Sequence, residues 1–250
     1  MIAASRKFVC VRLLTYECAA EEGFLEGIFL GRSGDLENTT FAVLAPDGKK
    51  RLSKAGRGPK MAYGHGARGV AAMAADMEKI AKKYPGKKDA LKAAPLPLVE
   101  DVRRAVNVSA CDNQPLVVVL GRDEKQQQEL ETRLAPLAWA DTNVGAFLYV
   151  STTSSKDLAA LAKTKAAPGY LVVQPDAYGQ KGQGIVQLPA AATAKTIQAA
   201  LDKARKQFKP LDKAHHRDHV RKGKRDGVNW ETEIPVTDPG KSPGGRGGRR

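Results

Sequence analysis

The stretch "KAAPGYLVVQPDAYGQKGQGIVQL" at residues 165–188 decides the fold of this chain. Two runs of aliphatic and β-branched residues enclose a segment rich in Pro, Asp and Gly, which is the composition of a turn between antiparallel strands. A comparable unit, "LENTTFAVLAPDGKKRLSKAG", stands at residues 36–56, where Pro46, Asp47 and Gly48 supply the turn. The sequence therefore predicts one hairpin in each half of the chain.

Helices and strands alternate around the second hairpin. We expect helices over 99–109, 124–139, 155–165 and 192–208, and strands over 115–121, 145–151, 170–174 and 185–188. Strands that alternate with helices indicate a mostly parallel sheet covered by helices, and the hairpin adds an antiparallel edge. The second half is therefore expected to be an α/β domain.

The first half contains fewer elements around its hairpin. The run "KFVCVRLLTY" at 7–16 is typical of a strand buried on both faces, and acidic residues open a predicted helix over 19–30. Apolar residues at alternating steps of three and four predict a helix over 67–84. Prolines and lost periodicity indicate a linker over 87–98.

The element order of the second half resembles the thioredoxin fold: strand, helix, strand, helix, then a proline, a hairpin and a final helix. The segment Ala167-Pro168-Gly169-Tyr170 falls where that family places its cis-proline. The resemblance covers roughly 1–86 and 99–208. It implies an α/β chain of two three-layer thioredoxin-like domains, the first incomplete at its N-terminus, followed by a disordered basic tail over 209–250.

The dithiol chemistry of that family has no counterpart in the second half. Thioredoxins use two thiols at a helix N-terminus, where backbone amides and the helix dipole stabilise the thiolate. The matching positions here are Arg122, Asp123, Glu124 and Lys125. We therefore expect this domain to be redox-inactive.

The first half fits the family in two registers. In one, Cys18 is the nucleophile and Glu21 replaces its resolving partner, but only about 20 residues then lead to Asn38, where the cis-proline belongs. In the other, residues 7–14 form the middle strand and the dithiol segment lies before Met1 or is absent. We favour the second register because its spacing suits the family.

Cys10, Cys18 and Cys111 form no CxxC pair, which argues against a disulfide framework and a structural zinc. Cys18 is either a thiol activated by a helix dipole or a packing residue in a turn, and neighbouring acids oppose the activated form. The "HHRDH" segment at 215–219 lacks a carboxylate or cysteine that completes a metal site. We expect no metal or cofactor.

Positive charge dominates the composition, with 41 Lys and Arg against 27 Asp and Glu and a net charge of +14. Two clusters are candidates for holding phosphates: Lys49, Lys50, Arg51, Lys54, Arg57 and Lys60 in the first half, and Arg221, Lys222, Lys224 and Arg225 in the second. Neither cluster contains the aromatics that stack on single-stranded bases. Each is either a polyanion site or a solvated surface.

Three functions follow as hypotheses. The first is a non-catalytic thioredoxin-like protein that binds other proteins. The second is a thiol-disulfide oxidoreductase that uses Cys18 or a dithiol segment upstream of Met1. The third is a protein that binds nucleic acid or another polyanion.

The sequence contains no positive signal for a compartment or an oligomeric state. No apolar run reaches the roughly 18 residues of a membrane span, so no membrane association is expected. A cytoplasmic location is the default without a signal, and export stays open if a segment precedes Met1. The oligomeric state stays open.

Overall fold

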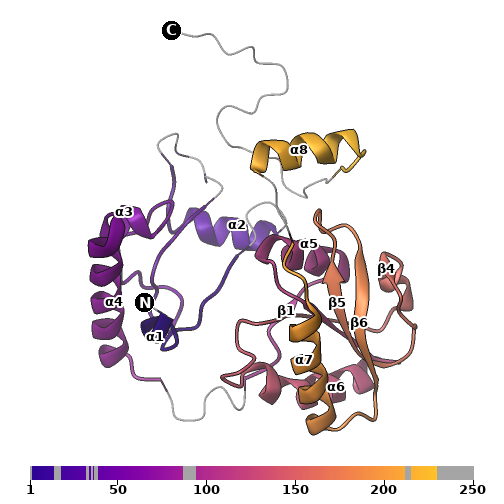
Figure 1. Cartoon of the computed structure of the whole chain (residues 1–250). Coiled ribbons are helices and arrows are strands. Elements are labelled where there is room, and N and C mark those ends of the chain that lie inside the picture. The colour runs from indigo at the N-terminus through magenta and orange to yellow at the C-terminus, as the bar shows by residue number, and fades with distance from the viewer. Residues whose placement is uncertain are drawn as a thin grey trace. The chain divides into compact units, whose positions relative to one another are not determined.

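The computed structural model describes residues 2–13, 18–31, 34, 36, 39–86, 94–211 and 215–229. The chain divides between Lys88 and Asp89 into two compact units, and described residues from there to Asn229 belong to the second. The described chain has a mixed α/β architecture (Figure 1). No helix of the described chain is long and apolar enough to cross a membrane.

The second unit is built on one six-stranded mixed sheet, in the order β1-β3-β2-β5-β6-β4. The strands are β1 Leu98–Val99, β2 Leu116–Leu120, β3 Leu148–Thr152, β4 Leu161–Ala162, β5 Gly169–Pro175 and β6 Gly182–Pro189. The strands β1, β3 and β2 run parallel, whereas β5 is antiparallel to both β2 and β6. Residues 169–189 therefore form the predicted antiparallel hairpin.

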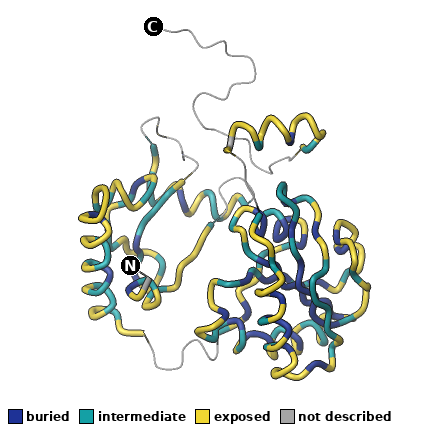
Figure 2. The backbone as a smooth tube through the Cα atoms, in the orientation of Figure 1, coloured by how far each residue is buried: buried dark blue, intermediate teal, exposed yellow. Residues whose placement is uncertain are grey.

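Helices cover both faces of this sheet, so the unit has three layers. The helices are α5 Val102–Asp112, α6 Glu124–Ala138 and α7 Ala194–Gln207. Val117 and Val119 of β2 pack with residues of α6 and α7, while Leu116, Val118 and Leu120 pack with residues of α5. The alternation of side chains along a strand thus divides one apolar run between two cores, and Figure 2 shows many buried residues along the sheet.

Two predictions of helix, strand or linker between residues 87 and 208 are wrong. Residues 155–165 were expected to form a helix, but they form a 3-10 turn, Ser155–Leu158, and the short strand β4. Leu158 and Leu161 are buried in the core, and β4 pairs with Gly182 and Gln183 of β6. Tertiary pairing outweighs the helix propensity of this Ala- and Lys-rich segment.

The second wrong prediction concerns the end of the linker. Leu98, predicted as the last residue of the 87–98 linker, and Val99, predicted to begin the helix over 99–109, form β1 against Tyr149 and Val150 of β3. The predicted helix is present but begins later, as α5 from Val102 to Asp112. The linker residues 87–93 lie outside the described part of the chain.

The first unit contains four helices in its described residues. They are α1 Ile2–Ser5, α2 Ala19–Glu26, α3 Pro59–Tyr63 and α4 Gly66–Lys83. The predicted helices at 19–30 and 67–84 are confirmed as α2 and α4, although α2 ends at Glu26.

The first hairpin is present as two arms joined by isolated bridges, Phe41 to Gly56 and Leu44 to Arg51. Its turn forms as expected because Gly48 takes a positive φ of 70° and Asp47 Oδ1 accepts a bond from the Lys49 amide at 2.9 Å. That bond lowers the pKa of Asp47. The hairpin is therefore held by its turn and a few backbone bonds.

The strand predicted over 7–16 is absent from its described residues. Residues 9–13 have no assigned secondary structure, and Val9 and Val11 are 69% and 70% exposed. A β-branched run favours extended backbone, but a strand also needs a neighbour to pair with. Residues 9–13 form no β-bridge with any described residue, and 14–17 lie outside the described chain.

The C-terminal segment also differs from its prediction. Residues His216–Arg225, expected to belong to a disordered tail, form the helix α8 within the second unit. The remainder of the predicted tail, 230–250, lies outside the described residues.

Candidate polyanion-binding surface

Helix α8 concentrates positive charge. It contains one acid, Asp218, and five cations, which we call the α8 surface: Arg217, Arg221, Lys222, Lys224 and Arg225. All five side chains are exposed, and the tube of α8 is exposed along most of its length in Figure 2. Three of these cations stand in the last turn, where they also stabilise the helix dipole.

The helix is held against the β5–β6 turn by an aromatic contact. The ring of His219 stacks on the ring of Tyr178, with centroids 4.6 Å apart and planes 24° from parallel. One turn further along α8, Gly223 is buried, and a Cβ at this glycine would meet the Tyr178 ring at 3.0 Å. A glycine therefore lets the tyrosine lie close to the helix backbone.

The segments on either side of α8 are also attached to this unit. The amide of Leu211 donates to Asn113 Oδ1 at 2.7 Å, and the amide of Lys209 donates to Gln174 Oε1 at 2.9 Å. After the helix, Gln180 Nε2 donates to the carbonyl of Asn229. The helix is thus fixed at its centre and through both flanking segments.

The turn that supports α8 is itself well ordered by local contacts. Asp176 Oδ1 accepts bonds from the amides of Gln180 at 2.9 Å and Lys181 at 3.3 Å. Gly179, at φ 67°, packs so closely on α5 that a Cβ would lie 2.6 Å from Asn107 Cα. The turn therefore offers Tyr178 a fixed position.

One side of α8 packs on Tyr178, and the five cations of the α8 surface stay exposed to solvent. His219 and Gly223, four residues apart, share the side that contacts Tyr178. Arg221 reaches Asp218 Oδ1 at 3.6 Å, with both side chains mostly exposed. A surface pair of this kind contributes at most about 1 kcal/mol, and salt or a competing anion weakens it.

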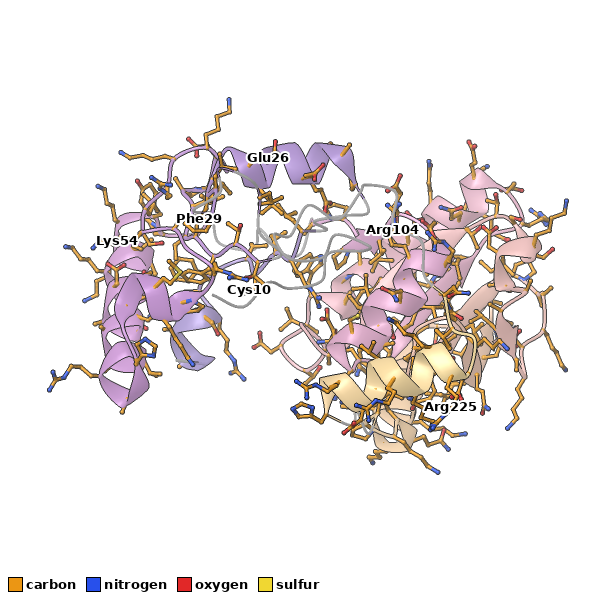
Figure 3. The ribbon with its side chains drawn as sticks, turned by 90° about the horizontal axis from the view of Figure 1, so that it is seen from above. Cys10, Glu26, Phe29, Lys54, Arg104 and Arg225 are labelled. Carbon is orange, nitrogen blue, oxygen red and sulfur yellow. The ribbon has the colours of Figure 1, made fainter. Side chains whose placement is uncertain are left out.

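The first-half cluster lies on the other unit. Its six cations, Lys49, Lys50, Arg51, Lys54, Arg57 and Lys60, are all exposed on the hairpin and the start of α3. Arg51 Nη1 donates to the carbonyl of Ile28 at 2.7 Å, which gives this side chain a structural contact. Figure 3 labels Lys54 on this unit and Arg225 on α8. The two clusters are therefore separate candidates.

The cysteines do not form a dithiol. Cys18 precedes α2 as its N-cap, is partly exposed, and makes no side-chain capping bond, while Glu21 and Glu22 occupy the first turn. Cys10, labelled in Figure 3, and Cys111 are exposed and form no disulfide. Cys18 thus stands at the start of the predicted helix, and no second thiol accompanies it in that turn.

The positions where the expected resemblance to thioredoxins places the two thiols contain no sulfur. Asp123 is the N-cap of α6, where its Oδ1 accepts a bond from the Gln126 amide at 2.8 Å. That bond, aided by Arg122, lowers the pKa of Asp123. The register pairs Leu120 with Gly169, so Pro168 lies beside the end of β2.

The prediction of a cis-proline at Pro168 is wrong. The described residues contain no cis peptide bond. The Pro168 carbonyl instead accepts a bond from the Ala190 amide at 3.0 Å, which continues the pairing of the hairpin.

No metal site is present among the described residues, because no three His, Cys, Asp or Glu side chains come together. In the "HHRDH" segment, the ring of His219 stacks on the ring of Tyr178. Sequence reasoning missed the role of Tyr178, which holds α8. The signal available was an aromatic residue inside the otherwise polar turn "PDAYGQKGQG".

Comparisons with protein-family models, with curated proteins and with solved structures give no significant match for this chain. The function is therefore argued from the residues and their geometry.

Proposed function

We propose that this protein binds polyanions through the α8 surface. The observation that carries the proposal is a helix with five exposed cations and one acid, docked on the second unit through Tyr178 and His219. Docking matters because an anchored helix holds its cations in a fixed array, which reduces the entropy lost when an anion binds.

Helix stability alone accounts for only part of this charge. Lys222, Lys224 and Arg225 stand in the last turn, where cations offset the helix dipole. Arg217 and Arg221 stand earlier, where the dipole gives them no such role. Their presence beside the other three favours an anionic partner with several charges.

Retention of the full chain on a heparin matrix, eluted with a salt gradient, tests this function. The α8 variant carries Arg217→Gln, Arg221→Gln and Lys224→Gln, and we expect it to elute at much lower salt. The control variant removes equal charge from exposed lysines of α6 and α7, with Lys125→Gln, Lys195→Gln and Lys203→Gln. Equal elution of the two variants contradicts the proposal.

A second candidate is a redox-inactive thioredoxin-like protein that binds other proteins. It is supported by the order of strands, helices, proline and hairpin in the second unit, and by the α6 N-terminus, where Arg122 and Asp123 stand in place of thiols. In an insulin-reduction assay we expect no turnover. Turnover that Cys18→Ser abolishes supports the oxidoreductase alternative instead.

A further inference from the structure

We infer that the α8 surface binds the phosphate backbone of double-stranded nucleic acid without reading its sequence. The inference rests on the polyanion-binding function proposed above and names the class of polyanion.

The spacing of the cations along α8 matches a run of backbone phosphates. Arg217, Arg221 and Lys224 stand at positions i, i+4 and i+7, so they share one face of the helix. At 1.5 Å of rise per residue this stripe is about 10 Å long. One strand of a duplex presents a phosphate about every 3.4 Å along its axis, so the stripe spans about three phosphates.

Lys222 and Arg225 extend the charged area beside this stripe. Lys222 follows Arg221 by one residue and so lies on the adjacent side of the helix. Arg225 stands four residues after Arg221 and so lies beside it, next to the stripe. The side of α8 that includes His219 and Gly223 is occupied by Tyr178. The exposed surface is therefore basic over two neighbouring rows of the helix.

The composition of α8 argues against a membrane surface. An interfacial helix buries an apolar face rich in Trp, Phe or Leu among the lipid headgroups. Val220, 39% exposed, is the only large apolar residue of α8, and the less charged side of the helix already contacts Tyr178. The helix has no apolar face left to insert.

The same features argue against single strands and acidic proteins. Single-stranded nucleic acid is held by aromatic side chains on which bases stack, but α8 contains no Phe, Tyr or Trp, and the rings of His219 and Tyr178 are stacked on each other. Protein interfaces depend on buried aromatic or aliphatic anchors at their centre, which the α8 surface also lacks. A charged array without anchors suits a duplex, whose phosphates are regularly spaced and whose bases are stacked inside.

Such binding is expected to be insensitive to sequence. Contacts to phosphate position a protein on nucleic acid but carry no base information. The α8 surface offers no Asn or Gln that pairs with adenine, and the inference assigns its Arg and Lys, which in other proteins also pair with guanine, to phosphates. Two duplexes of equal length and unrelated sequence should therefore bind with dissociation constants that agree within about twofold.

The test is fluorescence anisotropy of the full chain with labelled duplexes of unrelated sequence over a series of salt concentrations. Each phosphate contact contributes about 0.9 to the slope of log K against log salt, so loss of three contacts in the α8 variant reduces the slope by about 2.7. The control variant with Lys125→Gln, Lys195→Gln and Lys203→Gln should keep the wild-type slope. A matching single strand and vesicles with anionic lipid serve as competitors, and both should compete less well than unlabelled duplex.

Each other result overturns the inference. Tighter binding to single strands or vesicles, a strong sequence preference, or an unchanged slope in the α8 variant shows that the partner or the surface is wrong. Retention on heparin that depends on the α8 surface, without duplex binding, refutes this inference and leaves the proposed function standing. Failure to bind any polyanion refutes both.

Discussion

Asn143 forms the centre of a buried polar network that we expect to stabilise the second unit. This side chain is fully buried in the loop between α6 and β3. Its Nδ2 donates to the Leu137 carbonyl and to Gln198 Oε1, both at 2.8 Å, and its Oδ1 accepts from Arg205 Nη2 at 2.6 Å. One amide thus joins the end of α6 to α7.

The substitution Asn143→Ala removes these bonds and leaves the Leu137 carbonyl, Gln198 and Arg205 without them. A buried polar group that loses its partner costs about 1–3 kcal/mol. Gln198 and Arg205 are partly exposed, so water replaces some of what they lose. We therefore expect a loss of about 3 kcal/mol, which corresponds to a fall in Tm of about 10 °C for a unit of about 140 residues.

Urea unfolding followed by circular dichroism, together with thermal unfolding, measures this loss. Gln128→Ala is the matched control, because Gln128 is an exposed amide on α6, and it should change stability by less than about 0.5 kcal/mol. A loss below about 1 kcal/mol for Asn143→Ala refutes the reasoning, since the network would then be replaced by water at little cost.

Three further predictions concern other parts of the chain. Tyr178→Ala removes the stack on His219, so hydrogen exchange of the α8 amides should speed up while those of α5 keep wild-type protection; unchanged exchange in α8 shows that docking does not hold the helix. Gly169→Ala places a Cβ 2.0 Å from the Leu188 carbonyl at a φ of 145°, and we expect denaturant unfolding to show a loss of about 3 kcal/mol or more, whereas Gly86→Ala, with open space around it, should cost little. Burial and the bond to Asp76 raise the pKa of Tyr63 from 10.0 to about 12, so its contribution to stability is complete below pH 10 and lost as the pH rises to about 12. Difference absorbance between wild type and Tyr63→Phe should place this titration near pH 12, and a transition at pH 10 contradicts the burial argument.

Local signals were enough for the hairpin and for several helices. The turn residues around Gly48, and the apolar run that ends at Pro175, are signals that span only four or five residues. They were enough to predict both hairpins, which the structure contains. The helix over 67–84 followed from periodicity because one face carries its apolar residues. The absence of sulfur at Arg122 and Asp123 was also visible in the sequence, since it depends only on residue identity.

The sequence predicted the cations of the candidate site but not the helix that carries them. The cations Arg221, Lys222, Lys224 and Arg225 were identified as a cluster, but they were assigned to a disordered tail. The Arg and Lys residues of α8 favour a helix, but a ten-residue helix with almost no apolar area is marginal on its own, so its placement depends on contacts with a turn far away in the chain. Tyr178 and Gly223 make those contacts, and their pairing has no local pattern.

What the sequence determined by itself was the α/β alternation of the second half, the two turns, the charge, and the lack of paired thiols. The tertiary structure decided that residues 9–13 form no strand, that Leu161 and Ala162 pair with β6 rather than forming a helix, and that α8 docks on Tyr178. Turn chemistry and side-chain periodicity act between neighbours in the chain. Pairing and docking depend on surfaces that exist only after distant segments have folded together, because their free energy comes from area buried between those segments.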